Sequence, residues 1–126
     1  PGDHASTFGG NPFACTAALT ILNEIKRKDL LRNVLRRSTQ IEDGLDILAK
    51  EYSNIIVGHR GIGLLQGIVL NEEIIDAKKI TVSAFDKGLL LVPAGTNVLR
   101  IVPPLIISKN EINIILKKLS LIFKGL

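Results

Sequence analysis

The sequence GLLLVPAGTNVLRIVPP at residues 88–104 decides the fold. Two apolar runs, Leu89–Val92 and Val98–Val102, flank a segment that contains proline, glycine and asparagine. Short apolar runs on either side of such a segment predict two antiparallel strands. The prolines at 103 and 104 end the second strand, because proline has no amide hydrogen to donate to a sheet. We therefore expect a strand hairpin here.

A second hairpin is expected upstream. Its strands are predicted at Ile55–Val57 and Leu64–Leu70, and the residues GHRG at positions 58–61 have the composition of the connecting turn. The nearby sequence GIGLLQG does not match a dinucleotide-binding loop, because Gln66 replaces the third glycine and the segment enters a strand instead of opening a helix.

A helix apolar on most sides is predicted near the front of the chain. Asn11 is a good N-cap, and Pro12 suits the first helical position. Nearly every residue from Phe13 to Ile25 is apolar or small, so we expect this helix to be buried on most sides. Cys15 is accordingly expected in a core and not as a nucleophile.

Three amphipathic helices follow. Asp29 is the predicted cap of the second helix, whose apolar stripe runs from Leu31 to Leu48. Asp76 caps a short third helix that Gly88 ends. The last helix begins at residues 108–111, which have the form of a capping box. The expected buried face of the third helix comprises Ala77, Ile80, Ala84 and Phe85.

This order of elements predicts an α+β fold, in which helices cover one face of a small, antiparallel-rich sheet. The 126 residues fit one compact domain, and a hydrophobic content of 46% excludes disorder. No apolar run is long enough to span a membrane, so we expect a soluble protein. The chain starts at Pro1 and contains no methionine, so we expect a fragment or a processed piece.

Composition also bears on partners and location. The net charge of +4 is mild and its basic residues lack interleaved aromatics, so nucleic-acid binding is not expected. A single cysteine excludes an internal disulfide and a multi-cysteine zinc site, and it suits a reducing, cytoplasmic location.

Asp3, His4 and Ser6 are too close in sequence to converge as a hydrolase triad. His59 is expected on the surface.

Two features invite a functional interpretation, and each has a plain structural alternative. The loop from Ser6 to Pro12 combines two hydroxyls with two glycines in front of a helix N-terminus, which suits either a phosphate site or a well-capped surface loop. Arg100 is a lone cation in an apolar strand, where its guanidinium faces either a carboxylate or solvent.

Three motifs resemble the class III aminotransferases, which are pyridoxal-phosphate enzymes of fold type I. GDHASTFGGNPFACTAALTIL resembles the segment after that family's cofactor lysine, and RGIGLLQGIVL and GLLLVPAGTNVLRIVPPLIIS resemble its small-domain strands. The third motif is most similar to the members that act on N-acetylornithine. The resemblance implies the end of a large domain at residues 1–11, a linking helix at 12–28 and a small C-terminal domain at 29–126.

The resemblance also implies site residues. Thr7, with Ser6 beside it, matches the loop that binds the cofactor phosphate across a homodimer interface. Arg100 matches an arginine at the substrate end of the pocket, which in ornithine-type members either pairs with a glutamate or binds a substrate carboxylate. The Schiff-base lysine would lie upstream of this chain, so no catalytic residue is expected here. The implied reaction transfers the amino group of N-acetylornithine to 2-oxoglutarate. Ornithine, 4-aminobutyrate and succinylornithine remain alternative donors, and a non-enzymatic regulatory or assembly module remains an alternative class.

Overall fold

The computed structural model describes residues 6–126, which fall into two compact units, one ending at Leu31 and the other spanning Arg32–Leu126. The elements in chain order are α1 (Pro12–Arg27), α2 (Leu30–Glu51), β1 (Ile56–Ile62), β2 (Leu65–Leu70), α3 (Ala77–Asp86), β3 (Val92–Ala94), β4 (Val98–Ile101) and α4 (Lys109–Phe123). The predicted α+β fold is confirmed. In the described part of the chain, no helix is both long and apolar enough to cross a membrane.

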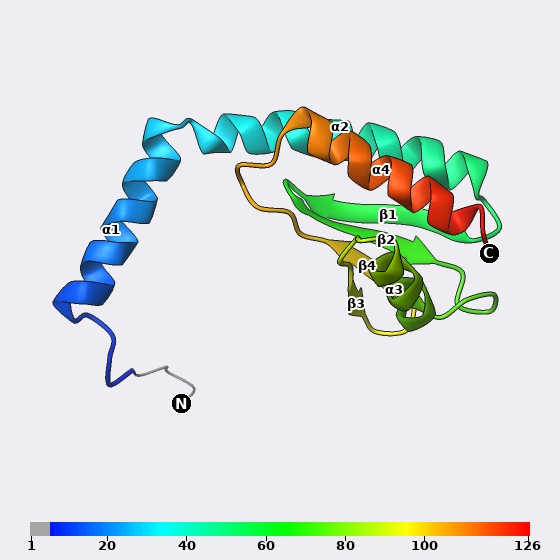
Figure 1. The fold of residues 1–126 in the computed structure, drawn as a ribbon, viewed down its shortest axis with the longest axis horizontal. Coiled ribbons are helices and arrows are strands. Elements are labelled where there is room, and N and C mark those ends of the chain that lie inside the picture. The colour runs from blue at the N-terminus through cyan, green and yellow to red at the C-terminus, as the bar shows by residue number, and fades with distance from the viewer. Residues whose placement is uncertain (1–5) are drawn as a thin grey trace. The chain divides into compact units, whose positions relative to one another are not determined.

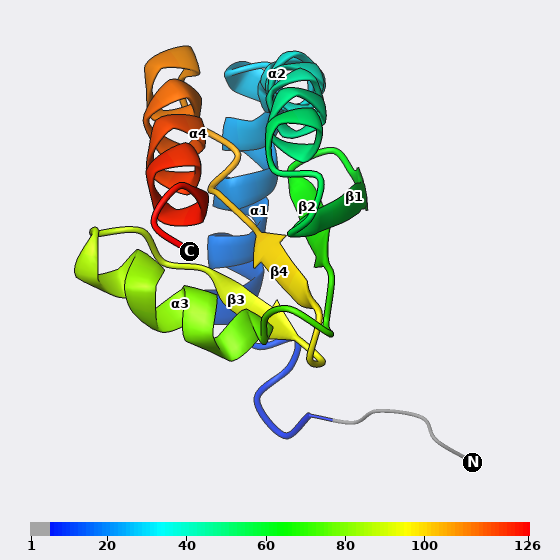
Figure 2. The ribbon, with the colours of Figure 1, turned by 90° about the vertical axis from the view of Figure 1, so that its right-hand side faces the viewer.

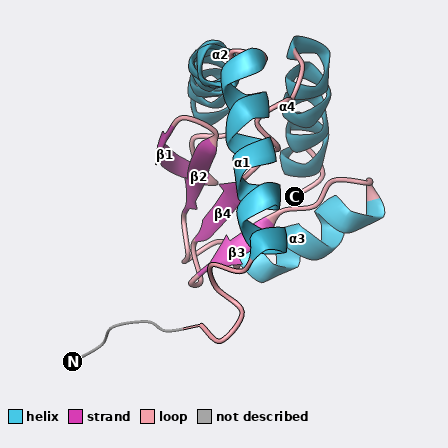
Figure 3. Cartoon of the chain, turned by 90° about the vertical axis from the view of Figure 1, so that its left-hand side faces the viewer, coloured by secondary structure: helices cyan, strands magenta, loops and turns pink. Residues whose placement is uncertain are grey.

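The second unit contains a four-stranded antiparallel sheet in the order β1-β2-β4-β3. Helices α2 and α4 lie side by side over one face of this sheet, and α3 lies next to β3 (Figures 1 and 2). Figure 3 shows the same helices and strands from the side opposite to that of Figure 2. One face of the sheet is therefore covered and the other is open within this unit.

The covered face forms a single core. Ile68 of β2 and Leu99 of β4 are paired in register and are fully buried. Residues of α2, α3 and α4 join them in one cluster, among them Ile41, Leu45, Ile80, Leu119 and Phe123. Because neighbouring residues of a strand point to opposite faces, the intervening residues of β2 and β4 belong to the open face.

The β1–β2 hairpin turns later along the chain than we expected. Gly58, His59, Arg60 and Gly61 belong to β1, and the chain reverses at Gly63, which has a positive φ of 56°. Gly58 lies at a β-bulge, where the register between β1 and β2 shifts. The glycines that read as a turn in the sequence thus serve a bulge and a close approach between strands.

The strand predicted at Leu89–Val92 begins only at Val92. Gly88 takes a positive φ of 67° and donates from its backbone N–H to Phe85, while the Leu89 N–H donates to Ala84. This pair of bonds is a Schellman motif, which confirms Gly88 as the end of α3 but delays the strand. Phe85 is 67% exposed, so its predicted place on the buried face was wrong.

Local capping follows the sequence at three of four helices. Asn11, Asp76 and Ser108 each accept a hydrogen bond from the backbone of the first helical turn, and the predicted capping box of α4 is complete. Asp29 precedes α2 with φ of 48°, which is not the extended conformation typical of an N-cap.

Three expected burials are not seen within the described residues. None of the residues of α1 is buried, and Cys15 is exposed. The unit that ends at Leu31 contains one complete helix, and a single helix cannot bury both of its own apolar sides. Leu31, predicted at the start of the apolar stripe of α2, is also exposed.

Candidate functional site

The loop in front of α1 presents exposed hydroxyls. Ser6 and Thr7 are both exposed, and within residues 6–126 neither side chain has a hydrogen-bond partner. The loop is held by its backbone, since the Gly9 N–H donates to the Ser6 carbonyl over 3.3 Å and Gly10 adopts a positive φ of 78°. Asp3 and His4 lie outside the described residues.

The helix behind this loop is well formed at its start. The Asn11 side chain accepts from the Ala14 N–H over 3.0 Å and donates to the Phe8 carbonyl. A 16-residue helix has a partial positive charge at its N-terminus, which favours a nearby anion. Hydroxyl donors with free hydrogens, glycine amides and this partial charge are a donor set that suits a phosphate group.

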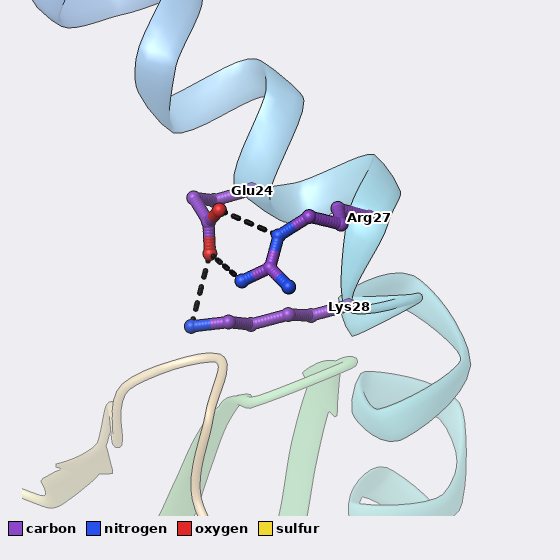
Figure 4. A network of polar contacts seen from close by, with 3 residues as sticks. All are labelled: Glu24, Arg27 and Lys28. Atoms are coloured by element: carbon purple, nitrogen blue, oxygen red, sulfur yellow. Dashed lines mark hydrogen bonds and ion pairs between the residues drawn. The ribbon is translucent and has the colours of Figure 1, made fainter.

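The helix ends in a compact ionic network. Glu24 accepts from Arg27 at 2.7 and 2.8 Å and from Lys28 at 2.9 Å, as Figure 4 shows. These side-chain hydrogen bonds lower the pKa of Glu24 from 4.5 to about 2. The basic residues also counter the partial negative charge of a helix C-terminus, where an unpaired glutamate would be unfavourable.

Arg100 lies on the open face of the sheet. It is exposed, whereas its neighbours Leu99 and Ile101 are buried on the opposite face. Its strand, β4, is flanked by β2 and β3, so Arg100 does not lie on an edge strand. Among the described residues no carboxylate forms an ion pair with Arg100.

A pocket of about 330 Å³ lies on this open face. The charged residues that line it are Arg100 from β4 and Arg60 from β1. Gly67 of β2 lies between them and is paired with both in the sheet register. The remaining lining residues are Gly61, Ile62, Leu65, Gln66, Ala94 and Val98. The pocket is thus apolar with two cations, which suits an anionic ligand with a hydrocarbon part.

The sequence did not point to Arg60, because its segment was interpreted as a turn. Its place in a strand follows only from the bulge at Gly58 and the late turn at Gly63. The period-two alternation around Arg100 was readable, and it predicted the correct face. His59 is also not a plain surface residue, since its Nε2 lies 2.9 Å from Asp46 Oδ1 and its side chain is only 18% exposed.

The sequence analysis also did not predict a polar cluster that lies between α2 and the β1–β2 hairpin. Gln66 is buried, and its Nε2 donates to Glu42 over 3.0 Å and to the Gly63 carbonyl over 2.9 Å. Ser38 donates to the same Glu42 carboxylate over 2.7 Å. These bonds fix α2 against the β1–β2 hairpin. Over residues 6–126 there is no group of three or more side chains suited to a metal ion.

Comparison with known proteins identifies the family. The family model for Aminotransferase class-III matches residues 1–123, nearly the whole chain. This chain belongs to the class III aminotransferases. The expectation from the three sequence motifs is thereby confirmed. The exposed hydroxyl loop and the two-arginine pocket are therefore features of an aminotransferase segment.

Relatives and solved structures agree. The acetylornithine aminotransferase of Prochlorococcus marinus subsp. pastoris is 64% identical over 98% of this chain, and that of Parasynechococcus marenigrum is 52% identical over 95%. The chain spans about 30% of the length of these curated relatives.

Two solved structures give the same picture. The acetylornithine aminotransferase of Elizabethkingia anophelis superposes with a TM-score of 0.90 at 28% identity and covers all of this chain, which spans 33% of that protein. The ornithine aminotransferase of Toxoplasma gondii, whose structure shows partial occupancy of PLP at the active site, superposes with a TM-score of 0.88 at 31% identity over 99% of this chain and 30% of its own. The fold of the described residues is thus that of an aminotransferase segment.

Proposed function

We propose that this chain is the C-terminal part of a pyridoxal-phosphate-dependent aminotransferase that transfers the amino group of N-acetylornithine to 2-oxoglutarate. The observation that carries the proposal is the 64% identity to an acetylornithine aminotransferase over 98% of the chain. On this proposal residues 1–11 end the large domain, residues 12–28 form the linking helix and residues 29–126 form the small domain. The enzyme is cytoplasmic.

The loop before α1 holds the cofactor phosphate. Thr7 and Ser6 donate their hydroxyl hydrogens to it, which the exposure of both side chains and their lack of a competing partner within residues 6–126 support. The loop reaches the site of the neighbouring subunit, so the active form is a homodimer. The exposed apolar residues of α1, including Phe13, Leu19 and Ile21, support burial of this helix against other parts of the assembly.

Pyridoxal phosphate supplies the electron sink for the bonds that break, and the protein supplies orientation and charge. The chain's ten lysines do not lie in the context of the lysine that holds the cofactor covalently. This segment therefore carries no catalytic residue and is inactive alone. Its contribution is to hold the phosphate and to select the substrate.

Arg100 binds a substrate carboxylate. The planar fork of a guanidinium donates two parallel hydrogen bonds to a carboxylate, and the exposed position of Arg100 in a pocket leaves both donors available. Lysine would retain the charge but lose the fork. In the full-length enzyme we expect Arg100→Lys to impair turnover. Unchanged kinetics with every substrate would make Arg100 merely structural.

The test of the cofactor loop is the affinity of the full-length enzyme for pyridoxal phosphate. A lost hydrogen bond to a charged group costs about 1.5–3 kcal/mol, so Thr7→Ala should weaken cofactor binding about 10- to 100-fold. The matched control is Thr20→Ala, since the Thr20 hydroxyl donates to the Thr16 carbonyl within α1. Equal cofactor dissociation constants for the two variants would contradict the assignment.

Ornithine is the second candidate amino donor, because an ornithine aminotransferase matches the fold with a TM-score of 0.88. The two donors differ by an acetyl group that removes one positive charge. Comparing kcat/KM for N-acetylornithine and ornithine with the full-length enzyme separates them. The proposal predicts a clear preference for N-acetylornithine, and a preference for ornithine would overturn the substrate assignment.

A further inference from the structure

A second pocket, here called the edge pocket, lies between α2 and the β1 side of the sheet. Its volume is about 440 Å³, and all of its lining residues belong to the unit Arg32–Leu126. Within the described residues β1 pairs only with β2, so it is an edge strand. Three acidic residues of α2 line the edge pocket: Glu42, Asp43 and Asp46. Residues three and four apart are neighbours on a helix surface, so these carboxylates lie close together.

The three carboxylates are not neutralised by a lysine or an arginine. Within residues 6–126 none of them forms an ion pair with either type of side chain. Glu42 accepts from two neutral donors, a serine hydroxyl and a glutamine amide. Asp46 is bonded to His59, and Asp43 is exposed without a partner in the described part of the chain. Because neighbouring carboxylates repel one another, a cation placed among them is favoured.

Arg60 also lines the edge pocket, but it lies at its rim. It pairs with Gly67, so its side chain leaves β1 on the open face of the sheet. His59 and Gly61, the residues on either side of it, belong to the covered face, which α2 overlies. The cation of Arg60 is therefore near the edge pocket without a bond to any of the three carboxylates in it.

Gln66 adds a hydrogen-bond acceptor that lacks a donor. The residue is 1% exposed, and among residues 6–126 its Oε1 has no partner. The amide cannot be reversed, because its Nε2 donates to Glu42 and to the Gly63 carbonyl, and those oxygens would repel Oε1. Oε1 lies against Gly61, where a Cβ would be 2.5 Å away, and both residues line the edge pocket. Since a buried acceptor without a donor is unfavourable, this wall of the edge pocket favours a ligand with hydrogens to donate.

We propose that the edge pocket binds a small organic cation with a guanidinium group. Asp43 and Glu42 balance its charge, and one of its N–H groups donates to Gln66 Oε1 past Gly61, which has no side chain to block the approach. A guanidinium suits the site better than an ammonium group, because it holds five N–H donors in one plane and is more weakly hydrated. The proposed amino transfer does not use these residues, so the inference is independent of it.

The test is binding of ethylguanidinium to the full-length holoenzyme, measured by saturation-transfer NMR. Ethylurea is the control ligand, because it has the same shape and no charge. For a ligand this small we expect a dissociation constant of about 1–10 mM, and binding of ethylurea that is weaker by about tenfold or more. Neither compound contains an alkylamine that could react with pyridoxal phosphate.

Asp43→Asn shows whether binding occurs at the edge pocket. This substitution removes one charge with little change of shape, at an exposed position where the fold does not depend on the side chain. Losing a charge-assisted hydrogen bond should weaken ethylguanidinium binding about tenfold and leave ethylurea unchanged. The matched control is Asp86→Asn, which removes an exposed carboxylate at the end of α3 and should not alter the binding of either compound.

Three results would each overturn the inference. The first is no saturable binding of ethylguanidinium to the parent enzyme in the millimolar range. The second is equal affinity for ethylguanidinium and ethylurea, which would show that charge is not recognised. The third is the same dissociation constant for Asp43→Asn and Asp86→Asn, which would place the bound cation elsewhere. All three are binding measurements, so they do not depend on which substrate the enzyme turns over.

Discussion

Replacing Gly61 with alanine tests how closely β1 and β2 approach each other. A Cβ at this position would lie 2.2 Å from the Leu65 carbonyl oxygen, 2.5 Å from Gln66 Oε1 and 2.8 Å from Gln66 Cα. Two of these three atoms belong to the backbone, so no change of rotamer relieves the clash. The strands must move apart, and the bonds of Gln66 to Glu42 and Gly63 must adjust with them.

The magnitude follows from two opposing effects. Overpacking a well-packed site costs about 1–3 kcal/mol. Alanine also restricts the unfolded chain, which favours folding by about 0.4–1 kcal/mol. Because the clash involves backbone atoms, the first effect dominates, and we expect Gly61→Ala to lower the free energy of unfolding by about 1–2 kcal/mol.

Gly58→Ala is the matched control. It lies in the same strand, but a Cβ there would meet no atom within 4 Å, so only the effect on the unfolded chain remains. We expect this variant to be as stable as the parent or slightly more stable. The assay is urea unfolding of the full-length protein, together with amide hydrogen exchange over residues 56–70. Equal stability and equal exchange for the two variants would refute the close approach at Gly61.

Three further predictions concern stability and charge. Ser108→Ala removes the side-chain half of the capping box with Glu111 and should cost about 1 kcal/mol in urea unfolding; no loss would show that the cap is dispensable. Leu99→Ala empties a fully buried site and should cost about 2–5 kcal/mol, whereas a cost below that of Ser108→Ala would contradict the core described here. The Glu24 pKa of about 2 lies below its ordinary value of 4.5, so the stability from this carboxylate is complete above pH 4.5 and lost as the pH falls toward 2. NMR titration of Glu24 should show a higher midpoint in Arg27→Gln, and an unchanged midpoint would rule out Arg27 as the main cause.

Much of the fold could be predicted from local chemistry. Asn11, Asp76 and Ser108 cap helices through their own side chains, so sequence spacing sufficed to find them. Alternation in the strand around Arg100 predicted its face for the same reason. The hairpin at 56–70 was misplaced because glycine has two uses. Gly61 permits a close approach to Gln66, and only Gly63 turns the chain.

Long-range contacts explain the other differences. Arg60 joins Arg100 only through pairing across β2, and the bulge at Gly58 sets which residue pairs with Gly67. No local pattern reveals such a register. The exposure of Cys15 has a similar origin, since the apolar composition of α1 indicates what must cover it but not where that cover lies in the chain.

The most direct measurement on the cofactor loop is subunit complementation in the full-length enzyme. One inactive subunit carries Ser6→Ala with Thr7→Ala, and the other lacks the upstream lysine that holds the cofactor. In a mixed dimer one of the two sites combines an intact loop with an intact lysine only if the loop serves the neighbouring subunit. We predict partial recovery of N-acetylornithine turnover on mixing. No activity above that of either variant alone, in dimers shown to be mixed, would contradict a loop shared between subunits.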